Sequence, residues 1–439
     1  MHKRLSRNQI LLYLAELLVI LWLLPGCFQK PVQTAVWNGA EFVLQTNTSE
    51  LKRYVSDGME LRPGVYQIRI DSHLQGGQLC QASLSCEDKP FRSLRGNGIQ
   101  LREGREHTVF TYYICDRLKD VFVRLNFESG DISAVREVQI YRTGAGNRIL
   151  LTLFLICAAV LNGLLSFRSH IREGRVTVQR QIVFFSLAGV TALAFFPYLT
   201  DYMILGTDSA NYLLRIETLA DGTISLRQSL ADGLLPLYLP ALLCRIGFPI
   251  MTSYKLSTLL WVCLAVWGAY HALYHCVQKE YAALLGAMAY TLFPWSLRLL
   301  YNEGAWGRYI VFAALPPLCA GLWELLQDRD TENTTGYWLG RISLGILCAV
   351  LALQGCLLDW KLSCNIEQSS IARWVPLVLM LTLAIAVCML YNRAEKHRRT
   401  FLFVAVLLLL IPAVYCVNEI AFCSDVYYLY SAEPLLSGV

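Results

Sequence analysis

Long apolar runs separated by short polar loops make up most of the chain. About nine of them approach the ~20 residues that a helix needs to cross the hydrocarbon core of a bilayer. They lie at 10–25, 149–167, 182–200, 256–274, 282–300, 309–326, 342–358, 374–391 and 401–417. This pattern predicts an α-helical polytopic membrane protein with about nine spans.

Basic residues gather in three of the polar segments. Arginine and lysine are frequent at the N-terminus, in the 168–181 loop and in the 392–400 loop. Short loops rich in lysine and arginine stay in the cytoplasm, so we expect all three on the cytoplasmic side of a cell membrane. About nine crossings satisfy this arrangement and place the C-terminal tail, 419–439, outside.

One further apolar segment, Leu234–Gly247, does not fit that count. It is short, and Pro236 and Pro240 interrupt it. Irregular backbone at membrane depth is tolerated where protein surrounds it. We therefore expect a re-entrant or interfacial helix on the outer face.

The first apolar run has two interpretations. Residues 1–27 form a membrane anchor if the run is a retained span. Basic residues before an apolar run that ends LLPGC also resemble a lipoprotein signal, with Cys27 as the lipidated residue. Glu16 and Pro25 are unusual in such a signal, and the anchor is favoured. Residues 28–147 are extracytoplasmic in either case.

Residues 28–147 show a different periodicity from the rest of the chain. Polar and apolar residues alternate in Gly64–Ile70, Thr108–Ile114 and Val121–Phe127, with Gly-rich turn signals between such runs. This is typical of an antiparallel β-sandwich, here inserted ahead of a membrane core at 148–418. The phrase LRPGVYQIRI resembles the opening strand of jelly-roll carbohydrate-binding modules. Any sandwich needs such strands, so a structural or protein-contact role is favoured over sugar binding.

Composition agrees with this division. Hydrophobic residues make up 55% of the chain and charged residues only 16%, with a net charge of +5. Soluble domains carry about 25% charged residues. No basic stretch has the length or aromatic content of a nucleic-acid site. In the predicted sandwich, Cys80 and Cys86 either pair or remain free thiols.

Ionisable residues cluster just beyond the third predicted span. The segment from Asp201 to Glu217 reads DYMILGTDSANYLLRIE. If 209–220 is helical, Tyr212 and Arg215 share a face and Asp208 lies at or near the N-cap. On composition alone, a capped interfacial helix with an Arg–Glu pair is favoured over a functional site.

Three stretches carry a family resemblance. They are GTDSANYLLRIETLADG, PLYLPALLCRIGFPIMTSYK and AYTLFPWSLRLLYNEGAWGRYIVFAALPPLCAGLWEL, and together they cover about 182–327. The chain resembles bacterial polytopic proteins of the 6-pyruvoyl-tetrahydropterin synthase-related group, which are related to YfhO-like proteins. That group is similar to glycosyltransferases of the GT-C class.

The resemblance implies an envelope enzyme. It would transfer a sugar from a polyprenyl-phosphate donor to a glycan or lipid acceptor at the outer membrane surface. Asp208 matches the catalytic acidic residue, with Asp201 as the alternative, acting as a general base or binding a divalent cation. Arg215 or Arg308 would meet the donor phosphate. Tyr212 and Glu303 would complete the substrate site.

The chain also departs from the family pattern. Tyr212 stands where a histidine commonly follows the aspartate, which weakens the case for a metal, so the predicted site contains no metal ligands. The later motif reads Glu303-Gly-Ala-Trp-Gly-Arg308, with the charges of the family's Arg–Glu motif exchanged. An ion pair would survive that exchange. The chain also has fewer helices after this motif than GT-C members generally have.

Two other hypotheses remain open. A non-catalytic membrane protein, such as an envelope-assembly scaffold or a transporter, would use the same helices, although no internal repeat of the transporter type is present. His271, His275 and Cys276 have a spacing that fits a metal, but they lack a carboxylate, and histidine is common at membrane interfaces.

Overall fold

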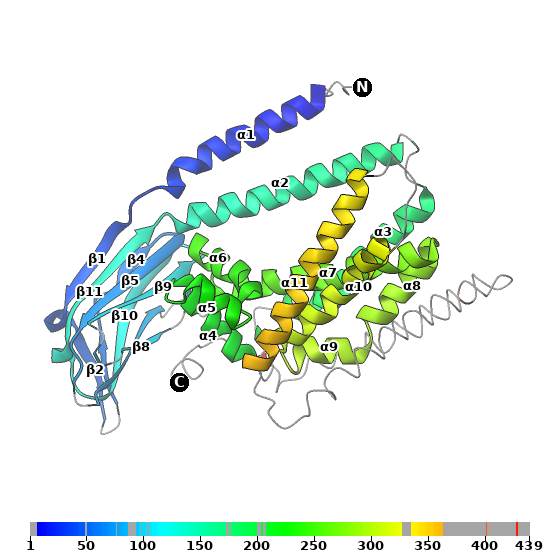
Figure 1. Cartoon of the computed structure of the whole chain (residues 1–439). Coiled ribbons are helices and arrows are strands. Elements are labelled where there is room, and N and C mark those ends of the chain that lie inside the picture. The colour runs from blue at the N-terminus through cyan, green and yellow to red at the C-terminus, as the bar shows by residue number, and fades with distance from the viewer. Residues whose placement is uncertain are drawn as a thin grey trace. The chain divides into compact units, whose positions relative to one another are not determined.

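The computed structural model describes most of the chain up to residue 362 and little beyond it. The described residues are 7–48, 51–75, 77–86, 94–96, 98–101, 103–104, 106–172, 174, 177–199, 203–204, 208–326, 335–362, 401 and 427–428. They divide into two compact units (Figure 1). The sandwich unit lies within 1–166 and 246–249, and the helical unit lies within 167–245 and 250–429.

Several helices are long and apolar enough to cross a membrane. Among the described residues there are four such spans: Ala145–Arg168, Val178–Leu199, Ile250–Val277 and Ser343–Lys361. The corresponding helices are α2 (Ala145–Arg172), α3 (Val178–Phe195) with the 3-10 turn η3 (Phe196–Leu199), α7 (Ile250–Val277) and α11 (Thr335–Leu362). The protein is therefore mostly helical, with a separate β-sheet region, as the sequence predicts.

The span expected at 282–300 is broken in the structure. It consists of α8 (Glu280–Thr291) and α9 (Pro294–Tyr301), which meet at an angle of 47°. Pro294 has no backbone N–H and is well suited to the first position of a new helix, so the bend falls there. Counting this pair as one span gives up to five.

The total of about nine spans stays a prediction. The run expected at 309–326 lies in α10 (Trp306–Leu326), and the first run lies in α1 (Arg7–Cys27). The runs expected at 374–391 and, apart from Phe401, at 401–417 lie outside the described residues. So do the 392–400 loop and nearly all of the 419–439 tail, so the predicted orientation is not tested there.

Leu234–Gly247 forms a short helix and not a span. The 3-10 turn η4 (Leu235–Leu237) leads into α6 (Tyr238–Ile246), whose nine residues are too few to cross a bilayer. The remaining helices of the helical unit are α4 (Ser209–Ala220) and α5 (Leu226–Ala231). A short ladder pairs β12 (Met203–Ile204) with β13 (Tyr427–Tyr428).

Two antiparallel sheets form the β-sandwich. Sheet I has the order β1-β11-β5-β9-β7, and sheet II has the order β2-β3-β10-β6-β8, with β4 also pairing with β10. The strands are β1 (Val32–Asn38), β2 (Val43–Asn47), β3 (Lys52–Val55), β4 (Met59–Leu61), β5 (Gly64–Ser72), β6 (Leu79–Cys86), β7 (Leu94–Gly96), β8 (Ile99–Leu101), β9 (His107–Ile114), β10 (Leu118–Ser129) and β11 (Val135–Thr143). The 3-10 turns η1 (Gly39–Glu41) and η2 (Ile132–Ala134) complete it.

Alternation along the strands builds the core of the sandwich. In β5, Ile68 and Ile70 are fully buried, while Gln67 and Arg69, which alternate with them, remain partly exposed. Val123 and Leu125 of β10 face them from the other sheet within the same apolar cluster. A period of two places every second side chain on the inner face, which is why the sequence pattern located these strands.

Helix α1 and the part of α2 up to Ser166 belong to the sandwich unit, and they contact each other. The Asn162 side-chain amide of α2 donates to both carboxylate oxygens of Glu16 in α1, at 2.9 and 3.2 Å. Near the sandwich, Gly26 packs so closely on Asn147 that a Cβ would overlap it. The Asn162 contact gives the otherwise unusual Glu16 of the first apolar run a hydrogen-bond partner.

Cys80 and Cys86 are both free thiols in the structure. They lie six residues apart on the same strand, β6. A strand rises about 3.3 Å per residue, so their Cα atoms are far beyond the ~7 Å that a disulfide can bridge. Of the two interpretations of these cysteines, the structure has the unpaired one.

Candidate functional site

The carboxylate of Asp208 lies at the start of α4 in the helical unit. Asp208 occupies the N-cap position and is fully buried, but its side chain makes no capping hydrogen bond to the helix. Its backbone N–H instead donates to the carbonyl oxygen of Glu303, at 3.1 Å. This bond ties the beginning of α4 to the turn between α9 and α10, far away in the sequence.

Helix α4 turns one apolar face inward. Tyr212, Ile216 and Leu219 recur at helical spacing, and all three are buried. The helix begins and ends at the residues that the sequence predicts. The Asp208 side chain does not cap α4. Ser225 differs, because its hydroxyl caps α5.

A buried ion-pair network lies beside this helix. One guanidinium nitrogen of Arg308, Nη1, is 2.8 Å from Glu303 Oε2, and Nε donates to Asp359 Oδ1 at 3.0 Å. The Arg308 side chain is 5% exposed and that of Asp359 4%. Arg298 approaches the other oxygen of Glu303 at 3.8 Å from a largely exposed position. Arg308 is thus held between two carboxylates.

Close backbone packing brings these charges together. Gly307 in α10 lies against α11, where an added Cβ would be only 2.5 Å from the backbone nitrogen of Asp359 and 2.6 Å from the carbonyl oxygen of Gly355. Gly355 has no side chain either, so the helices approach without a clash. Because Arg308 follows Gly307 directly, the crossing places its side chain at Asp359.

Tyr212 links Asp208 to the network. Its hydroxyl accepts a hydrogen bond from the Gly307 N–H at 3.4 Å, and its ring stacks near that of Trp306. Burial, reinforced by the negative charges of Asp208 and Asp359, holds the pKa of Tyr212 well above its usual value. The phenol therefore remains neutral and contributes a hydroxyl group beside the carboxylates.

Four of the predicted site residues converge, and one stands apart. Asp208, Tyr212, Glu303 and Arg308 lie together through the contacts above. Arg215 is on α4 two turns after Asp208, is half-buried, and makes no ion pair with any described residue. Asp201, the alternative catalytic residue, lies outside the described residues.

The exchanged charges of the 303–308 motif still form an ion pair, as the sequence analysis expects. Asp359 is not among the predicted site residues, because a carboxylate at the end of an apolar run is ordinarily solvated at the membrane interface. One sequence feature could have indicated Asp359. Arg308 also lies in an apolar run, and a charge in such a run needs a partner of opposite charge. Its neighbour Lys361 is exposed and lies 3.6 Å from Asp232.

The described residues contain no group of three or more histidine, cysteine or acidic side chains placed to hold a metal ion. His271 and His275 are neighbours on α7, with ring centres 6.3 Å apart. Cys276 is exposed. This cluster therefore lacks the further ligands that a zinc site needs.

Comparison with known proteins gives no relative to set beside this geometry. No family model matches the chain, and neither a curated protein nor a solved structure does. The family resemblance of the 182–327 region therefore stays a prediction.

Proposed function

We propose that the chain is a GT-C-like glycosyltransferase of the cell envelope. It would transfer a sugar from a polyprenyl-phosphate donor to an envelope glycan or lipid at the outer surface of the membrane. The observation that carries the proposal is the convergence of Asp208 and Tyr212 with the Glu303–Arg308–Asp359 network. Buried ionisable groups are costly among apolar helices, so their concentration in one place favours a functional site.

Asp208 serves as the general base in this proposal. Its carboxylate takes the proton of an acceptor hydroxyl while the acceptor oxygen bonds to the anomeric carbon of the donor sugar. The bond between that carbon and the phosphate oxygen breaks, and the phosphate leaves with the electron pair. Asp208 is fully buried, so segments over it must move before an acceptor reaches it.

The two arginines have different roles. Arg308 is already neutralised by Glu303 and Asp359, which suits it to positioning these helices. Arg215 is half-buried and has no ion-pair partner among the described residues, which suits it to the donor phosphate. A divalent cation beside the phosphate would act in the same direction as Arg215.

A non-catalytic scaffold is the second candidate. The complete burial of Asp208 and the neutralised state of Arg308 favour it, because a structural ion-pair network has both properties. The two functions differ in what the Asp208 carboxylate must do.

Asp208→Asn tests the proposal. The substitution keeps the shape of the side chain but removes the basic group, and no capping hydrogen bond is lost, because the Asp208 side chain makes none. We expect the protein to insert normally and the sugar transfer to be lost. The measurement compares glycan and glycolipid profiles of membranes from strains with the native chain, Asp208→Asn or a deletion, at equal protein abundance.

Asp221→Asn is the matched control, because Asp221 is the exposed residue at the other end of α4. It should leave the profile native. An Asp208→Asn profile identical to the native one, with the deletion different, rejects Asp208 as the base and leaves Asp201. A profile that even deletion does not alter favours the scaffold.

A further inference from the structure

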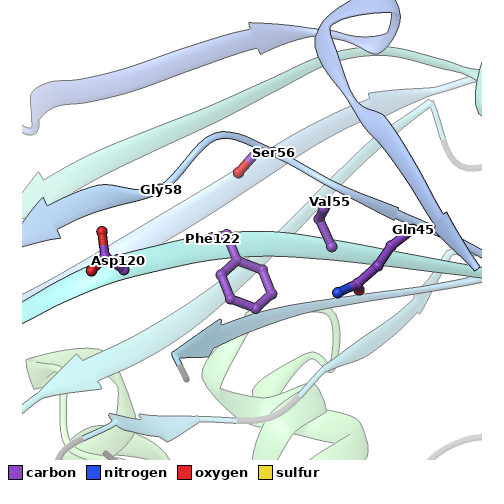
Figure 2. Close-up of a pocket in the computed structure, with 6 residues that line it drawn as sticks. All are labelled: Gln45, Val55, Ser56, Gly58, Asp120 and Phe122. Atoms are coloured by element: carbon purple, nitrogen blue, oxygen red, sulfur yellow. The ribbon is translucent and has the colours of Figure 1, made fainter. Parts of the chain in front are cut away.

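A small hollow lies on sheet II of the sandwich unit. Figure 2 shows Phe122 of β10 in it, between Asp120 on one side and Gln45 on the other. Phe122 is only 9% exposed, and the Arg124 guanidinium lies 5.6 Å from the centre of its ring. The aromatic wall is therefore covered, and this hollow offers a partner little beyond polar side chains. The helical unit has a surface of the opposite kind.

Helix α5 exposes its leucines and buries a polar residue. Leu226 is 60% exposed and Leu230 43%, whereas Ser229 is fully buried. The buried hydroxyl is satisfied, because it donates to the Ser225 carbonyl oxygen at 2.9 Å and accepts from the Tyr238 hydroxyl at 3.0 Å. A short helix on a water-exposed surface has the reverse arrangement, with its apolar side chains facing the core. An apolar environment outside α5 explains the inversion.

The end of α5 is bonded to a candidate membrane span. Gln354 of α11 lies within the candidate span Ser343–Lys361 and is 6% exposed. Its side-chain amide donates to the Leu230 carbonyl oxygen at 3.1 Å and accepts from the Leu235 N–H at 3.4 Å. Gln354 precedes the last residue of the span by seven positions. Because a helix rises 1.5 Å per residue, the end of α5 lies up to about 10 Å inside the end of the span.

The turn between α5 and η4 meets the requirement for irregular backbone at this depth. The N–H groups of Asp232, Gly233 and Leu234 donate to carbonyl oxygens of α5, at 2.9, 3.4 and 2.8 Å. Gly233 has a φ of 73° and packs so closely on α11 that an added Cβ would be 2.5 Å from the backbone nitrogen of Leu358. Backbone polar groups at membrane depth have to be satisfied within the protein, and these N–H groups are.

Side chains typical of a membrane boundary lie close to this turn. Trp360, at the end of α11, is 81% exposed, and tryptophan is enriched where lipid tails meet headgroups. Lys361 reaches Asp232 at 3.6 Å, so the turn after α5 is fixed at the same boundary. Arg227 follows Leu226 directly and is exposed. Its long side chain lets the guanidinium reach a lipid phosphate while the stem stays among apolar groups.

We propose that α5 is seated in the lipid at the C-terminal end of α11, with Leu226 and Leu230 among the acyl chains and Arg227 at the phospholipid phosphates. The sequence indicates membrane contact for Leu234–Gly247 but not for α5, which is short and polar in part. The partner is the bilayer itself, because the two leucines belong to a helix that is bonded to a candidate membrane span. The assignment does not depend on the transferase proposed above.

The test places the photoreactive amino acid p-benzoyl-phenylalanine at Leu226 of the full-length protein, by suppression of an introduced stop codon. The protein is reconstituted into nanodiscs of phosphatidylcholine and phosphatidylglycerol, irradiated, and analysed by mass spectrometry for covalent lipid adducts. Leu347, which is 55% exposed within the candidate span of α11, is the positive control. Val43 of β2 in the sandwich is the matched negative control, because it is 60% exposed, as Leu226 is.

We expect lipid adducts from positions 226 and 347 and none from position 43. With Arg227→Gln added, the share of phosphatidylglycerol among the adducts at position 226 should fall by up to about fivefold, the effect of one basic residue at an anionic lipid surface. Position 230 provides the same measurement if the variant at position 226 does not fold.

Three outcomes overturn the proposal. The first is lipid adducts from position 347 without any from positions 226 and 230. The second is an adduct at position 226 to another protein chain, since a protein would then cover this face. The third is an equal yield from position 43, because exposure alone would then explain the adducts. A phosphatidylglycerol share that Arg227→Gln leaves unchanged overturns the contact between Arg227 and lipid phosphate.

Discussion

The two units handle charge in opposite ways. In the sandwich, ion pairs such as Lys52–Asp131 and Arg117–Glu60 lie on the surface, and the core between the sheets is apolar. In the helical unit, Asp208, Arg308 and Asp359 lie inside, each at most 5% exposed. Surface pairs contribute little to stability, whereas a buried charge is costly unless it is paired.

This difference shows where function is to be sought. The sandwich needs no special explanation for its charges, because water solvates them. The interior charges of the helical unit oppose the apolar pattern of their own helices. Arg308 and Asp359 are tolerated there because Arg308 pairs with Asp359 and with Glu303, which come from distant segments of the chain. Such an arrangement either fixes how the helices pack or forms a functional site. Mutations should affect stability in the first case and activity in the second.

The largest effect is expected for Arg308→Met. This substitution leaves Glu303 and Asp359 without their shared counter-charge, and breaking a buried pair in this way costs about 3–5 kcal/mol. Hydrogen exchange of the detergent-solubilised chain, read by mass spectrometry, should show α10 and α11 losing protection. The sandwich strands should keep theirs.

Arg69→Met in the sandwich is the matched control. Arg69 pairs with Asp71 at 3.2 Å from a partly exposed position, so its loss should cost less than about 1 kcal/mol. Combining Arg308→Met with Glu303→Leu and Asp359→Leu should recover most of the lost stability, because an apolar replacement of a whole buried network is often tolerated. Similar losses for Arg308→Met and Arg69→Met would contradict the contrast between the units.

Strands of the sandwich were largely predictable from the sequence. The runs expected at Gly64–Ile70 and Thr108–Ile114 lie within β5 and β9, because alternation with a period of two is a local property of the chain. The register shifts between Leu44 and Thr46 of β2 and between Leu118 and Val121 of β10 were not predictable. Each depends on the register between two strands and not on either strand alone.

Local pattern was less informative in the helical unit. The family resemblance indicated one site made of Asp208, Tyr212, Arg215, Glu303 and Arg308. Four of these residues lie together, and Arg215 stands apart. The sequence did not indicate Asp359, because a carboxylate at the end of an apolar run looks solvated until its partner, 51 residues away, is known. The break before Pro294 was missed for a similar reason, as a helix start and a continued span share the same composition.

A smaller effect is expected where a charge lies between two otherwise apolar helices of the sandwich unit. Glu16→Leu removes both hydrogen bonds from Asn162. Hydrogen bonds between membrane helices contribute about 0.6–2 kcal/mol, so the α1–α2 pair should weaken by that amount. Glu16→Gln, which keeps an acceptor, should weaken it less. The measurement is a double-mutant cycle with Asn162→Leu, using thermal melting of the detergent-solubilised chain.

The coupling energy of that cycle decides the outcome. Strictly additive losses would mean that the two side chains do not interact in the membrane. Mass spectrometry of the mature protein adds an independent check, since a chain that begins with a lipidated Cys27 would lack Glu16 altogether and would restore the lipoprotein interpretation.

The smallest effect concerns the acid sensitivity of the sandwich surface. Burial alone would raise the pKa of Asp71, but hydrogen bonds from His107 and Arg69 outweigh it and bring the pKa below its usual value. A carboxylate with a lowered folded-state pKa stabilises the fold above its unfolded-state value of ~4. That contribution is lost as the pH falls further, through the folded-state pKa. Asp71→Asn should therefore destabilise the native sandwich at pH 7 and leave it less sensitive to acid than the native chain. Hydrogen exchange of β5 and β9 in the full-length protein, followed from pH 7 to pH 3 with correction for the intrinsic exchange rate, measures both effects.

Asp57→Asn serves as the comparison, because Asp57 is exposed and its carboxylate has no partner among the described residues. If the two variants lose protection with the same pH dependence, Asp71 makes no special contribution, and the surface charges of the sandwich are as interchangeable as their exposure suggests.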